Sequence, residues 1–363
     1  MRIAQIAPLY ERVPPLLYGG TERVVSYLTE ELVRQGHDVT LFASGDSITR
    51  ARLVACSERS LRLDKQVVDP LAHHFVLLEE VFARAGEFDF LHFHIDYLHY
   101  PLSQRRRNLS HLTTLHGLLD LPDLKRLYKT FSKVPVVSIS NAQRRPLPWV
   151  NWQGTVYHGL PIDLYKPGLV PGKYLVFLGR VSPEKRLDRA IEIAKRTGIP
   201  LKVAAKVDDF DREYFENSIR HLLQDPLVEW IGEVNESQKQ QLLANAYALL
   251  FPIDWPEPFG LVLIEAMACG TPAIAYRCGS VPELIEEGVT GFIVDDSNEA
   301  VEAVAKIENL DRLACRRRFE ERFSATRMAQ DYLNIYTRIL DPAARADGLQ
   351  ISSGPPIQPN LLS

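Results

Sequence analysis

Short apolar runs alternate with helical patterns along nearly the whole chain, and this alternation limits the possible folds more than any other feature. Residues 2–7 are apolar and carry little charge, which is typical of a strand buried on both faces. Residues 21–35 then place apolar side chains on one helical face, and Gly36 is a helix stop signal. Because such units recur, the sequence predicts an α/β fold with parallel sheets.

The alternation falls into two series separated by residues 158–167, where one glycine and two prolines break the pattern. In the first series we expect strands at 2–7, 38–43, 88–94, 111–115 and 135–139, and helices at 21–35, 73–84 and 123–131. In the second we expect strands at 174–178, 201–206, 228–231, 248–253, 272–276 and 291–294. The sequence therefore predicts two doubly wound domains, residues 1–160 and 161–325.

The C-terminal part of the chain divides into a helix and a tail. Residues 326–341 carry apolar side chains at helical spacing, so they are expected to form a terminal helix packed on the folded part. Proline, glycine and serine dominate residues 342–363, which predicts a flexible tail.

Length and composition narrow the class of protein. The 363 residues suit two domains, and a formal charge of -4 gives no overall field for holding nucleic acid. No apolar run approaches the ~18 residues of a membrane-spanning helix, and the N-terminal run is too short for a secretory signal. The four cysteines form no C-x-x-C pair, which disfavours a disulfide scaffold or zinc site and favours the reducing cytoplasm.

The most informative motif lies in residues 254–272, between two expected strands. Pro258 and Gly260 suit a turn that starts a helix, so Glu257 is expected in the loop and Glu265 in the second helical turn. Both carboxylates would then face one cleft. The first backbone N–H groups of the helix, around Phe259, Gly260 and Leu261, have no intrahelical acceptor and would bind a phosphate or a sugar hydroxyl.

Glu257-Pro-Phe-Gly, Glu265 and the following Ala-Met-Ala-Cys-Gly-Thr-Pro resemble the E-x7-E signature of retaining glycosyltransferases of family 4. The resemblance implies the GT-B fold, in which two Rossmann-like domains face a central cleft and a C-terminal helix crosses back to the N-domain. It also implies that Glu265 binds the ribose hydroxyls and that Glu257 lies beside the donor sugar.

Two further motifs resemble the family's phosphate-binding parts. Arg180 and Lys185 directly follow an expected strand, where fixed cations can neutralise a departing diphosphate without a metal ion. Gly19 and Gly20 resemble the N-terminal glycine-rich loop, which lets backbone approach the donor diphosphate or the acceptor, and Tyr18 beside them is expected on the acceptor side.

Histidines gather near the expected carboxyl ends of the N-domain strands. By resemblance, His116 lies near an outer hydroxyl of the donor sugar, while His94 and Asp96 lie where acceptor-binding residues are found. A metal centre is the alternative, but His92 and His94 on one strand face bring no defined third ligand, so we expect no metal. For His92 and His99 a purely structural role is equally open.

Other positions carry weaker indications. Glu233 and Val234 match the segment that meets the nucleobase, and Lys206 is a candidate phosphate contact where the usual glycine-rich turn is missing. His158-Gly159 departs from the family's common Asn-Gly. Residues 209–211 mimic a metal-binding D-x-D motif but are expected to be a solvated loop. Two arginine triplets, residues 105–107 and 316–318, are expected on solvated faces, with contact to a membrane surface or anionic acceptor as the alternative.

These features together predict a retaining enzyme that transfers a hexose, glucose in our interpretation, from a UDP-sugar to an acceptor hydroxyl without a cofactor. Segments around residues 7–15 and 251–258 also resemble a bacterial subgroup described as UDP-glucose:tetrahydrobiopterin glucosyltransferases. The partners would be a nucleotide sugar and a small-molecule or glycan acceptor. Two alternatives stay open: a GT-B phosphorylase or sugar-nucleotide synthase, and a non-catalytic protein that binds nucleotide sugars. The oligomeric state is open as well.

Overall fold

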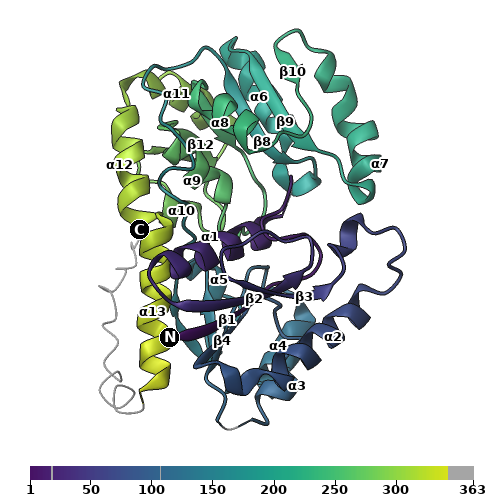
Figure 1. The fold of residues 1–363 in the computed structure, drawn as a ribbon. Coiled ribbons are helices and arrows are strands. Elements are labelled where there is room, and N and C mark those ends of the chain that lie inside the picture. Colours follow the sequence, from purple (N-terminus) through teal and green to yellow (C-terminus); the bar gives the residue numbers. More distant parts are fainter. Residues whose placement is uncertain (18, 107, 342–363) are drawn as a thin grey trace, which may run out of the picture.

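Two parallel sheets, one above the other in Figure 1, form the framework of the protein. The structure is a computed structural model, and it describes residues 1–17, 19–106 and 108–341. The first sheet has seven strands in the order β3-β2-β1-β4-β5-β6-β7. Its strands are β1 (Arg2–Ile6), β2 (Asp38–Ser44), β3 (Arg52–Ser57), β4 (Phe90–Phe93), β5 (His111–Thr114), β6 (Val136–Ser138) and β7 (Trp152–Thr155).

The second sheet has six strands in the order β10-β9-β8-β11-β12-β13. Its strands are β8 (Leu175–Arg180), β9 (Leu201–Lys206), β10 (Val228–Trp230), β11 (Ala248–Phe251), β12 (Ala273–Tyr276) and β13 (Gly291–Val294). In both sheets every pairing between named strands is parallel. The strand order reverses direction once in each sheet, between β1 and β4 in the first and between β8 and β11 in the second. The predicted arrangement of two doubly wound sheets is confirmed, and such sheets bind ligands beyond the carboxyl ends of their strands.

Helices cover the faces of both sheets. The first domain contains α1 (Gly20–Arg34), α2 (Pro70–Ala83), α3 (Tyr100–Ser103), α4 (Pro122–Thr130) and α5 (Asn141–Arg144). The second contains α6 (Leu187–Thr197), α7 (Arg212–Tyr214), α8 (Glu236–Ala244), α9 (Leu261–Ala268), α10 (Val281–Leu284) and α11 (Ser297–Val304). The helices α12 (Arg312–Arg322) and α13 (Ala325–Leu340) run down one side of the molecule.

Two strands, β3 and β7, were not predicted from the sequence. Both lie at the edges of the first sheet, where one side has no neighbouring strand. Their residues are therefore only partly buried. β7 lacks the continuous apolar run that marks central strands, whereas β3 contains such a run at residues 53–56 and was missed despite it. The predicted helix at 73–84 begins earlier, at Pro70, because the Asp69 side chain accepts a hydrogen bond from Leu71 N and caps it.

The chain crosses between the two halves twice, and the two crossings are hydrogen-bonded to each other. Leu160 N donates to Phe323 O at 2.9 Å, and Ala325 N donates to Leu160 O at 2.8 Å. A Cβ on Gly159 would lie 2.3 Å from Ser324 O, so only glycine fits there. After the second crossing α13 packs on the N-terminal sheet, where Tyr336 stacks on Phe90 with ring centroids 4.3 Å apart. The predicted return of the terminal helix to the N-domain is confirmed.

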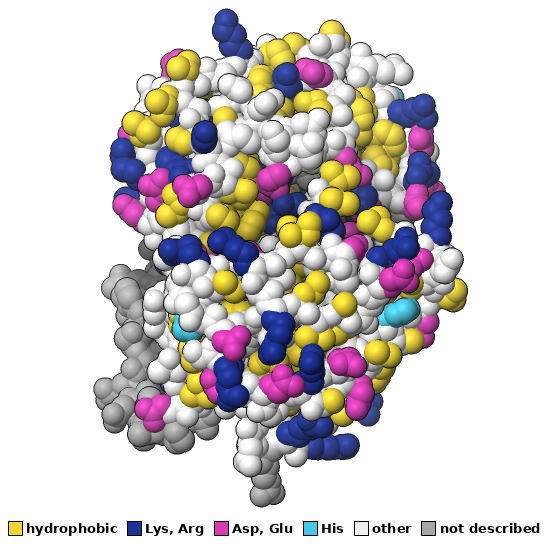
Figure 2. All heavy atoms as spheres, in the orientation of Figure 1, with side chains coloured by type: hydrophobic (Ala, Val, Ile, Leu, Met, Phe, Trp, Pro, Cys, Tyr) yellow, Lys and Arg dark blue, Asp and Glu magenta, His cyan; other side chains and the backbone are white. Residues whose placement is uncertain are grey.

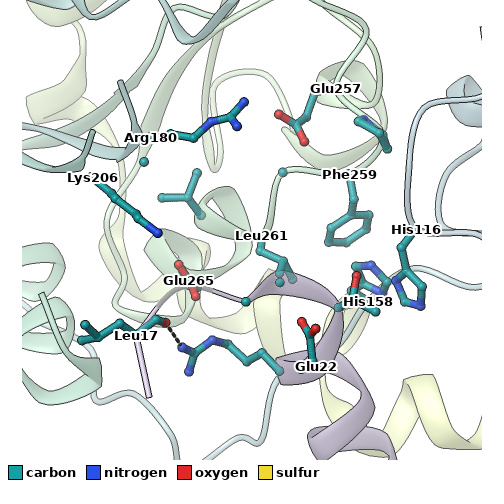
Figure 3. Close-up of a pocket in the computed structure, with 18 of the residues that line it drawn as sticks. Leu17, Glu22, His116, His158, Arg180, Lys206, Glu257, Phe259, Leu261 and Glu265 are labelled. Carbon is teal, nitrogen blue, oxygen red and sulfur yellow. Dashed lines mark hydrogen bonds between the residues drawn. The ribbon is translucent and has the colours of Figure 1, made fainter. Parts of the chain in front are cut away.

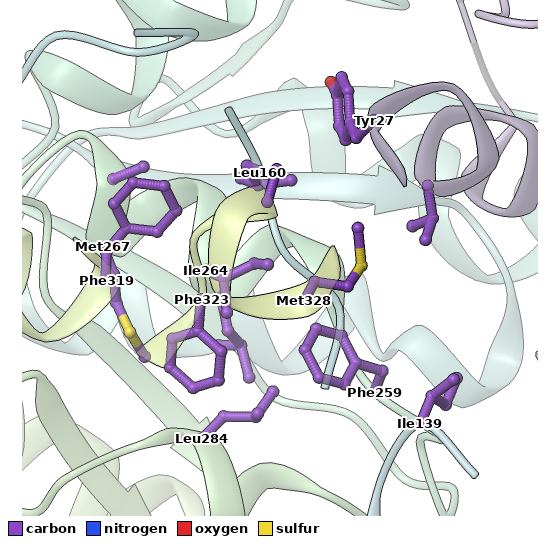
Figure 4. Packing of buried hydrophobic residues seen from close by; sticks show 14 of the residues in the cluster. Tyr27, Ile139, Leu160, Phe259, Ile264, Met267, Leu284, Phe319, Phe323 and Met328 are labelled. Carbon is purple, nitrogen blue, oxygen red and sulfur yellow. The ribbon is translucent and has the colours of Figure 1, made fainter. Parts of the chain in front are cut away.

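A continuous hydrophobic cluster joins the halves at this crossing. Figure 4 shows Phe259, Ile264 and Phe323 packed between residues of both domains, with Met328 of α13 beside them. Phe259 and Phe323 meet edge to face with ring centroids 6.3 Å apart. This packing fixes α9 relative to the first domain.

The second arginine triplet is only partly a solvated face, contrary to expectation. Arg316 donates hydrogen bonds to the carbonyl oxygens of Ile162, Tyr165 and Ala268, and so ties α12 to the interdomain segment. In the first triplet Arg106 donates to Phe82 O at 2.9 Å, while Arg107 lies outside the described residues. The predicted tail at 342–363 also lies outside them, and among the described residues no helix is long and apolar enough to cross a membrane.

Candidate active site

A cavity of about 670 Å³ lies where the carboxyl ends of the two sheets face each other. Figure 2 shows the two halves meeting in a band in which lysine and arginine side chains gather between apolar ones. All the site residues predicted from sequence that the structure describes line this one cavity, and Tyr18 lies outside the described residues. They are Gly19, Gly20, His94, Asp96, His116, Arg180, Lys185, Lys206, Glu233, Val234, Glu257, Phe259, Gly260, Leu261 and Glu265.

Lys185 and Glu257 form an ion pair at the C-domain wall of the cavity. Lys185 Nζ lies 2.5 Å from Glu257 Oε2, and Trp255 Nε1 donates to the same oxygen at 3.0 Å. The Lys185 ammonium also lies 4.6 Å from the centre of the Trp255 ring. The two side chains are mostly buried. A ligand in the cavity would therefore meet a cation and a carboxylate that are already held in place.

Arg180 and Lys206 lie nearby on the ends of β8 and β9, as Figure 3 shows. Acidic partners hold both cations. Arg180 Nη2 lies 2.7 Å from Glu184 and its Nε lies 3.6 Å from Asp211, while Lys206 Nζ lies 2.9 Å from Asp208. The expectation of a solvated loop at 209–211 is wrong for its last residue, because Asp211 is buried against Arg180. Burial raises the pKa of Asp211.

Helix α9 begins at this cavity. Gly260 caps it with φ of 86°, a left-handed conformation that glycine adopts without strain, so the N–H groups of the first turn face the cavity. Glu257 lies in the loop before the helix and Glu265 in its second turn, as predicted. Glu265 Oε1 lies 2.7 Å from Lys239 Nζ, which in turn lies 3.3 Å from Glu236.

The glycine-rich loop contributes the opposite wall. Gly19 has φ of 152°, and a Cβ there would lie 2.8 Å from Pro15 Cβ. A Cβ on Gly20 would lie 3.6 Å from Leu261 Cδ1 at the start of α9, so the loop approaches the other domain closely. Arg23 in the first turns of α1 forms an ion pair with Glu236 and thereby bridges the two domains.

The histidines of the N-domain form a buried group. His94 Nδ1 lies 2.9 Å from His116 Nε2, and His116 stacks on His158 with ring planes 18° apart. Burial lowers the pKa of His116 to about 3, so this ring is neutral at physiological pH. Nearby, Asp96 lines the cavity with φ of 49°, and desolvation of its carboxyl between the cavity walls raises its pKa to about 6.

The question left open for His92 and His99 is decided by their contacts. His99 hydrogen-bonds Ser103 at 3.0 Å and Thr113 at 2.7 Å, and both of its ring nitrogens are used. His92 likewise uses both nitrogens, on Tyr336 and Thr114. Both histidines are fully buried and lie behind the cavity, so they are structural.

Comparison with known proteins assigns the family. The model described as "Glycosyl transferases group 1" matches residues 167–323, and that described as "Glycosyltransferase Family 4" matches residues 18–150. The chain belongs to the GT-B glycosyltransferases. Each half of the cavity is thus supplied by one of the two family domains.

Individual proteins to which this glycosyltransferase is similar support the same family assignment. It is 24% identical to O-antigen chain mannosyltransferase C of Escherichia coli, over 93% of this chain and 99% of that protein. Its fold matches AviGT4, a glycosyltransferase involved in avilamycin A biosynthesis, with TM-score 0.72 and 23% identity, covering 94% of this chain and 98% of that one. It also matches Anabaena HepE in complex with UDP and glucose, with TM-score 0.72 and 18% identity, over 93% and 99% of the chains. Some other curated relatives match over about half their length.

Sequence reasoning missed three residues of the glycosyltransferase cleft. Glu22 lies in the first turn of α1, and burial raises the pKa of its carboxyl to about 7. Figure 3 shows its carboxylate pointing toward the cleft on the same side as His116 and His158. His158, treated as part of a linker, packs against Phe259 with ring centroids 4.7 Å apart.

The third missed residue is Gly279, which supports Glu257 from behind. A Cβ there would lie 2.3 Å from Glu257 O and 2.4 Å from Glu257 N. The neighbouring Ser280 N donates to Glu257 O at 3.0 Å, and Ser280 Oγ donates to Phe259 O at 2.7 Å. The signal in the sequence was a lone glycine after an apolar strand, which by itself marks only a turn.

The residues that the structure describes contain no cluster of three or more His, Cys, Asp or Glu side chains able to hold a metal ion. Lysine and arginine side chains that face the cleft of this glycosyltransferase include Arg180, Lys185 and Lys206, each paired with a carboxylate. All four cysteines are free thiols.

Proposed function

We propose that this glycosyltransferase retains anomeric configuration and transfers a hexose, glucose in the first instance, from a UDP-sugar to an acceptor hydroxyl. The observation that carries the proposal is the pairing of Lys185 with Glu257 at 2.5 Å beside Arg180, all at the wall where α9 begins. Cations and free backbone N–H groups at one wall match the charge of a departing diphosphate.

The chemistry follows from that placement. When the bond between the anomeric carbon and the diphosphate oxygen breaks, negative charge builds on the diphosphate and positive charge on the sugar ring. Arg180, Lys185 and the α9 N-terminus stabilise the diphosphate. The leaving oxygen then takes the proton of the acceptor hydroxyl, which attacks from the same face. Glu257 lies beside the sugar, where a carboxylate stabilises the developing oxocarbenium character.

The remaining donor contacts are assigned by position. Glu265 on α9 would hydrogen-bond the ribose hydroxyls, and Glu233 and Val234, which follow β10, would meet the base through their backbone. Lys206 would add a phosphate contact. Support for UDP and glucose comes from the resemblance of the motifs, and HepE, whose fold this chain shares, was crystallised with UDP and glucose.

The acceptor is assigned to the N-domain wall. Asp96 and His94 line the cavity there, and the Asp96 carboxyl can accept a hydrogen bond from an acceptor hydroxyl. Given the subgroup that the sequence resembles, a reduced pterin is the first acceptor to test. Closure of the two domains around the donor would exclude water, which competes as an acceptor.

A thermal-shift screen with UDP, GDP and ADP tests the donor, followed by hydrolysis assays with the matching sugars and NMR of the product anomer. We expect UDP to stabilise the protein, and an α-linked product from an α-linked donor. Glu257→Gln is expected to abolish transfer while UDP still binds. Glu302→Gln, on the exposed face of α11, is the matched control and retains activity.

Three results would overturn the proposal. If no nucleoside diphosphate stabilised the protein, a nucleotide-sugar donor would be excluded. A strict requirement for free phosphate would favour a phosphorylase, and full function of Glu257→Gln with UDP still bound would favour a non-catalytic sensor.

A further inference from the structure

Lys239 on α8 lines the cavity beside Glu265 and forms an ion pair with it. The Lys239 ammonium nitrogen lies 2.7 Å from Glu265 Oε1 and 3.3 Å from Glu236 Oε1. The side chains of Lys239 and Glu265 are only 11% and 6% exposed, so bulk water hardly reaches the pair. A ligand at this wall therefore meets Glu265 together with its counter-ion, and not as an isolated carboxylate.

The start of α8 holds the backbone of Lys239 in place. Asn235 and Gln238 form a reciprocal cap, in which Asn235 Oδ1 accepts from Gln238 N at 3.0 Å and Gln238 Oε1 accepts from Asn235 N at 2.9 Å. Lys239 N then donates to Asn235 O at 2.8 Å. Because this backbone is fixed before a ligand binds, little conformational entropy is lost when the ammonium contacts the ligand.

The second carboxylate near Lys239 has other partners. Glu236 pairs with Arg23 of the first domain and accepts a hydrogen bond from the hydroxyl of Tyr165. Glu236 therefore does not depend on Lys239 for its counter-charge. An ammonium group has three N–H groups, and among the described residues the two carboxylates take two of them, which leaves one for a ligand in the cavity.

The pair of Lys239 and Glu265 lies between the two ends of the proposed nucleotide site. The base segment, residues 233–234, comes just before α8, and Lys239 is the fourth residue of that helix. The diphosphate end is the N-terminus of α9, and Glu265 lies four residues after Leu261 on that helix, about 6 Å along its axis. A nucleotide that extends from the base segment to the start of α9 thus carries its ribose past this pair.

The two charges of the pair match the two hydrogen-bonding functions of a vicinal diol. Each ribose hydroxyl can both donate and accept, whereas a carboxylate only accepts and an ammonium only donates. A lone carboxylate would leave the hydroxyl oxygens without a donor in a mostly buried site, which weakens binding. Lys239 supplies that donor. It also neutralises Glu265, which would otherwise repel the diphosphate in the same cavity.

We propose that Lys239 is a further donor-binding residue, which donates a hydrogen bond to the ribose diol while Glu265 accepts one from it. This inference rests on the proposed function for the nucleotide and for Glu265. It adds the residue that, together with Glu265, distinguishes a ribonucleotide from a nucleotide without the diol.

Calorimetric binding of UDP and of 2′,3′-dideoxy-UDP tests the inference. The wild-type protein should prefer UDP about 100-fold or more, because each lost hydrogen bond to a charged group weakens binding about tenfold or more. Lys239→Met should lower this preference about tenfold. Lys202→Met is the matched control and should leave the preference unchanged, because Lys202 pairs with Glu229 at 3.2 Å and does not line the cavity.

A purely electrostatic role of Lys239 would give a different result. If the ammonium only neutralised Glu265, Lys239→Met would weaken UDP and dideoxy-UDP by the same factor, and that result would overturn the inference. A wild-type protein that bound both nucleotides equally well would overturn it too.

A second background covers the case in which Lys239→Met does not fold because Glu265 lacks its counter-charge. The two nucleotides are then compared in Glu265→Gln with and without Lys239→Met. Lys239 should still favour UDP in Glu265→Gln, and its removal should lower the remaining preference about tenfold. An equal preference in the two proteins would contradict the role of Lys239.

The binding data also separate this inference from the proposed function. If the wild-type protein binds neither UDP nor any other nucleoside diphosphate, the proposed donor is wrong, and the role of Lys239 is wrong with it. If UDP binds and the preference over dideoxy-UDP is the same in the wild type and in Lys239→Met, only the role of Lys239 is wrong.

Discussion

At the scale of single residues, the cleft combines charges that are paired with charges whose ionisation is disfavoured. Lys185 and Glu257 neutralise each other across 2.5 Å, whereas Glu22 and Asp96 line the same cavity with raised pKa values. The two carboxyls with raised pKa values change charge between pH 5 and 8. Removal of a paired group and removal of such a carboxyl should therefore have different consequences.

Lys185→Met tests the paired cation. Loss of the ammonium removes stabilisation of the departing diphosphate and leaves Glu257 without its counter-charge, so kcat/KM for transfer should fall about 10²- to 10³-fold. Steady-state kinetics measure this. Lys195→Met removes an exposed lysine of α6 that is paired with Asp225 and does not line the cavity, so it should change kcat/KM less than twofold. Equal effects of the two variants would remove Lys185 from the reaction.

Asp96 predicts the pH dependence of transfer. If its carboxylate accepts the hydrogen bond of the acceptor, kcat/KM should fall about tenfold per pH unit below the pKa of about 6. Asp96→Asn should abolish this fall at low pH, here called the acidic limb, and should lower the value of kcat/KM reached above the pKa. Glu22→Gln should leave the limb in place, and a limb that persists in Asp96→Asn would assign it to another group.

Glu22 predicts a pH-dependent stability. Its pKa is about 7 when folded and 4.5 as the ordinary value, so the protonated form favours folding and the carboxylate opposes it. The free energy of unfolding should thus decrease as pH rises from about 4.5 to about 7. Glu22→Gln removes this penalty and should stabilise the protein by up to about 3 kcal/mol at pH 8, with little gain at pH 4. Urea unfolding at both pH values measures this, and a gain independent of pH would contradict it.

At the scale of elements, the loop before α9 depends on a second loop behind it. The Cβ of an alanine at Gly279 would overlap the backbone of Glu257, so the loop and its carboxylate must shift. Displacement of reacting groups by about 1 Å can cost about 10²-fold in rate.

Gly279→Ala should therefore lower kcat/KM on the order of 10²-fold. Gly198→Ala is the matched control, because Gly198 has φ of 68° and no atom within 4 Å of an added Cβ. Both variants pay the backbone cost of about 1–2 kcal/mol for a left-handed alanine. Thermal unfolding should register both, but only Gly279→Ala should lose activity. Loss of activity in both would trace the effect to stability.

At the scale of the whole molecule, the two domains are joined at the paired crossings and touch again across the cleft through Arg23 and Glu236. Glu283 adds a contact near the crossings, since its carboxylate accepts hydrogen bonds from Asn141 N and Ala142 N of the first domain. The relative position of the domains thus depends on a few polar contacts and on the cluster around Phe259.

Arg23→Met should shift the protein toward an open state. A partly buried ion pair contributes about 1 kcal/mol, so the ratio of closed to open molecules should fall about fivefold and KM for the donor should rise by up to the same factor. Small-angle scattering should show a larger radius of gyration. Arg2→Met, which breaks an exposed pair with Asp89 inside the first domain, should change neither quantity. An unchanged radius in Arg23→Met would show that the pair does not control closure.

The sequence alone determined the two parallel sheets, the central strands, the terminal helix and the motifs that line the cleft. Buried strands and the start of α9 carry local signals, because continuous apolar runs, prolines and glycines act within a few residues of themselves. The edge strand β7, with the sequence Trp-Gln-Gly-Thr, carries a weaker signal, and both edge strands, β3 and β7, were missed.

Only the tertiary structure decided which groups meet. The pairing of Lys185 with Glu257, the burial that raises the pKa of Glu22 and the overlap that excludes a side chain at Gly279 all join residues far apart in the chain. Ionisation and hydrogen-bond direction depend on surrounding atoms rather than on neighbouring residues, and those atoms come together only in the folded protein.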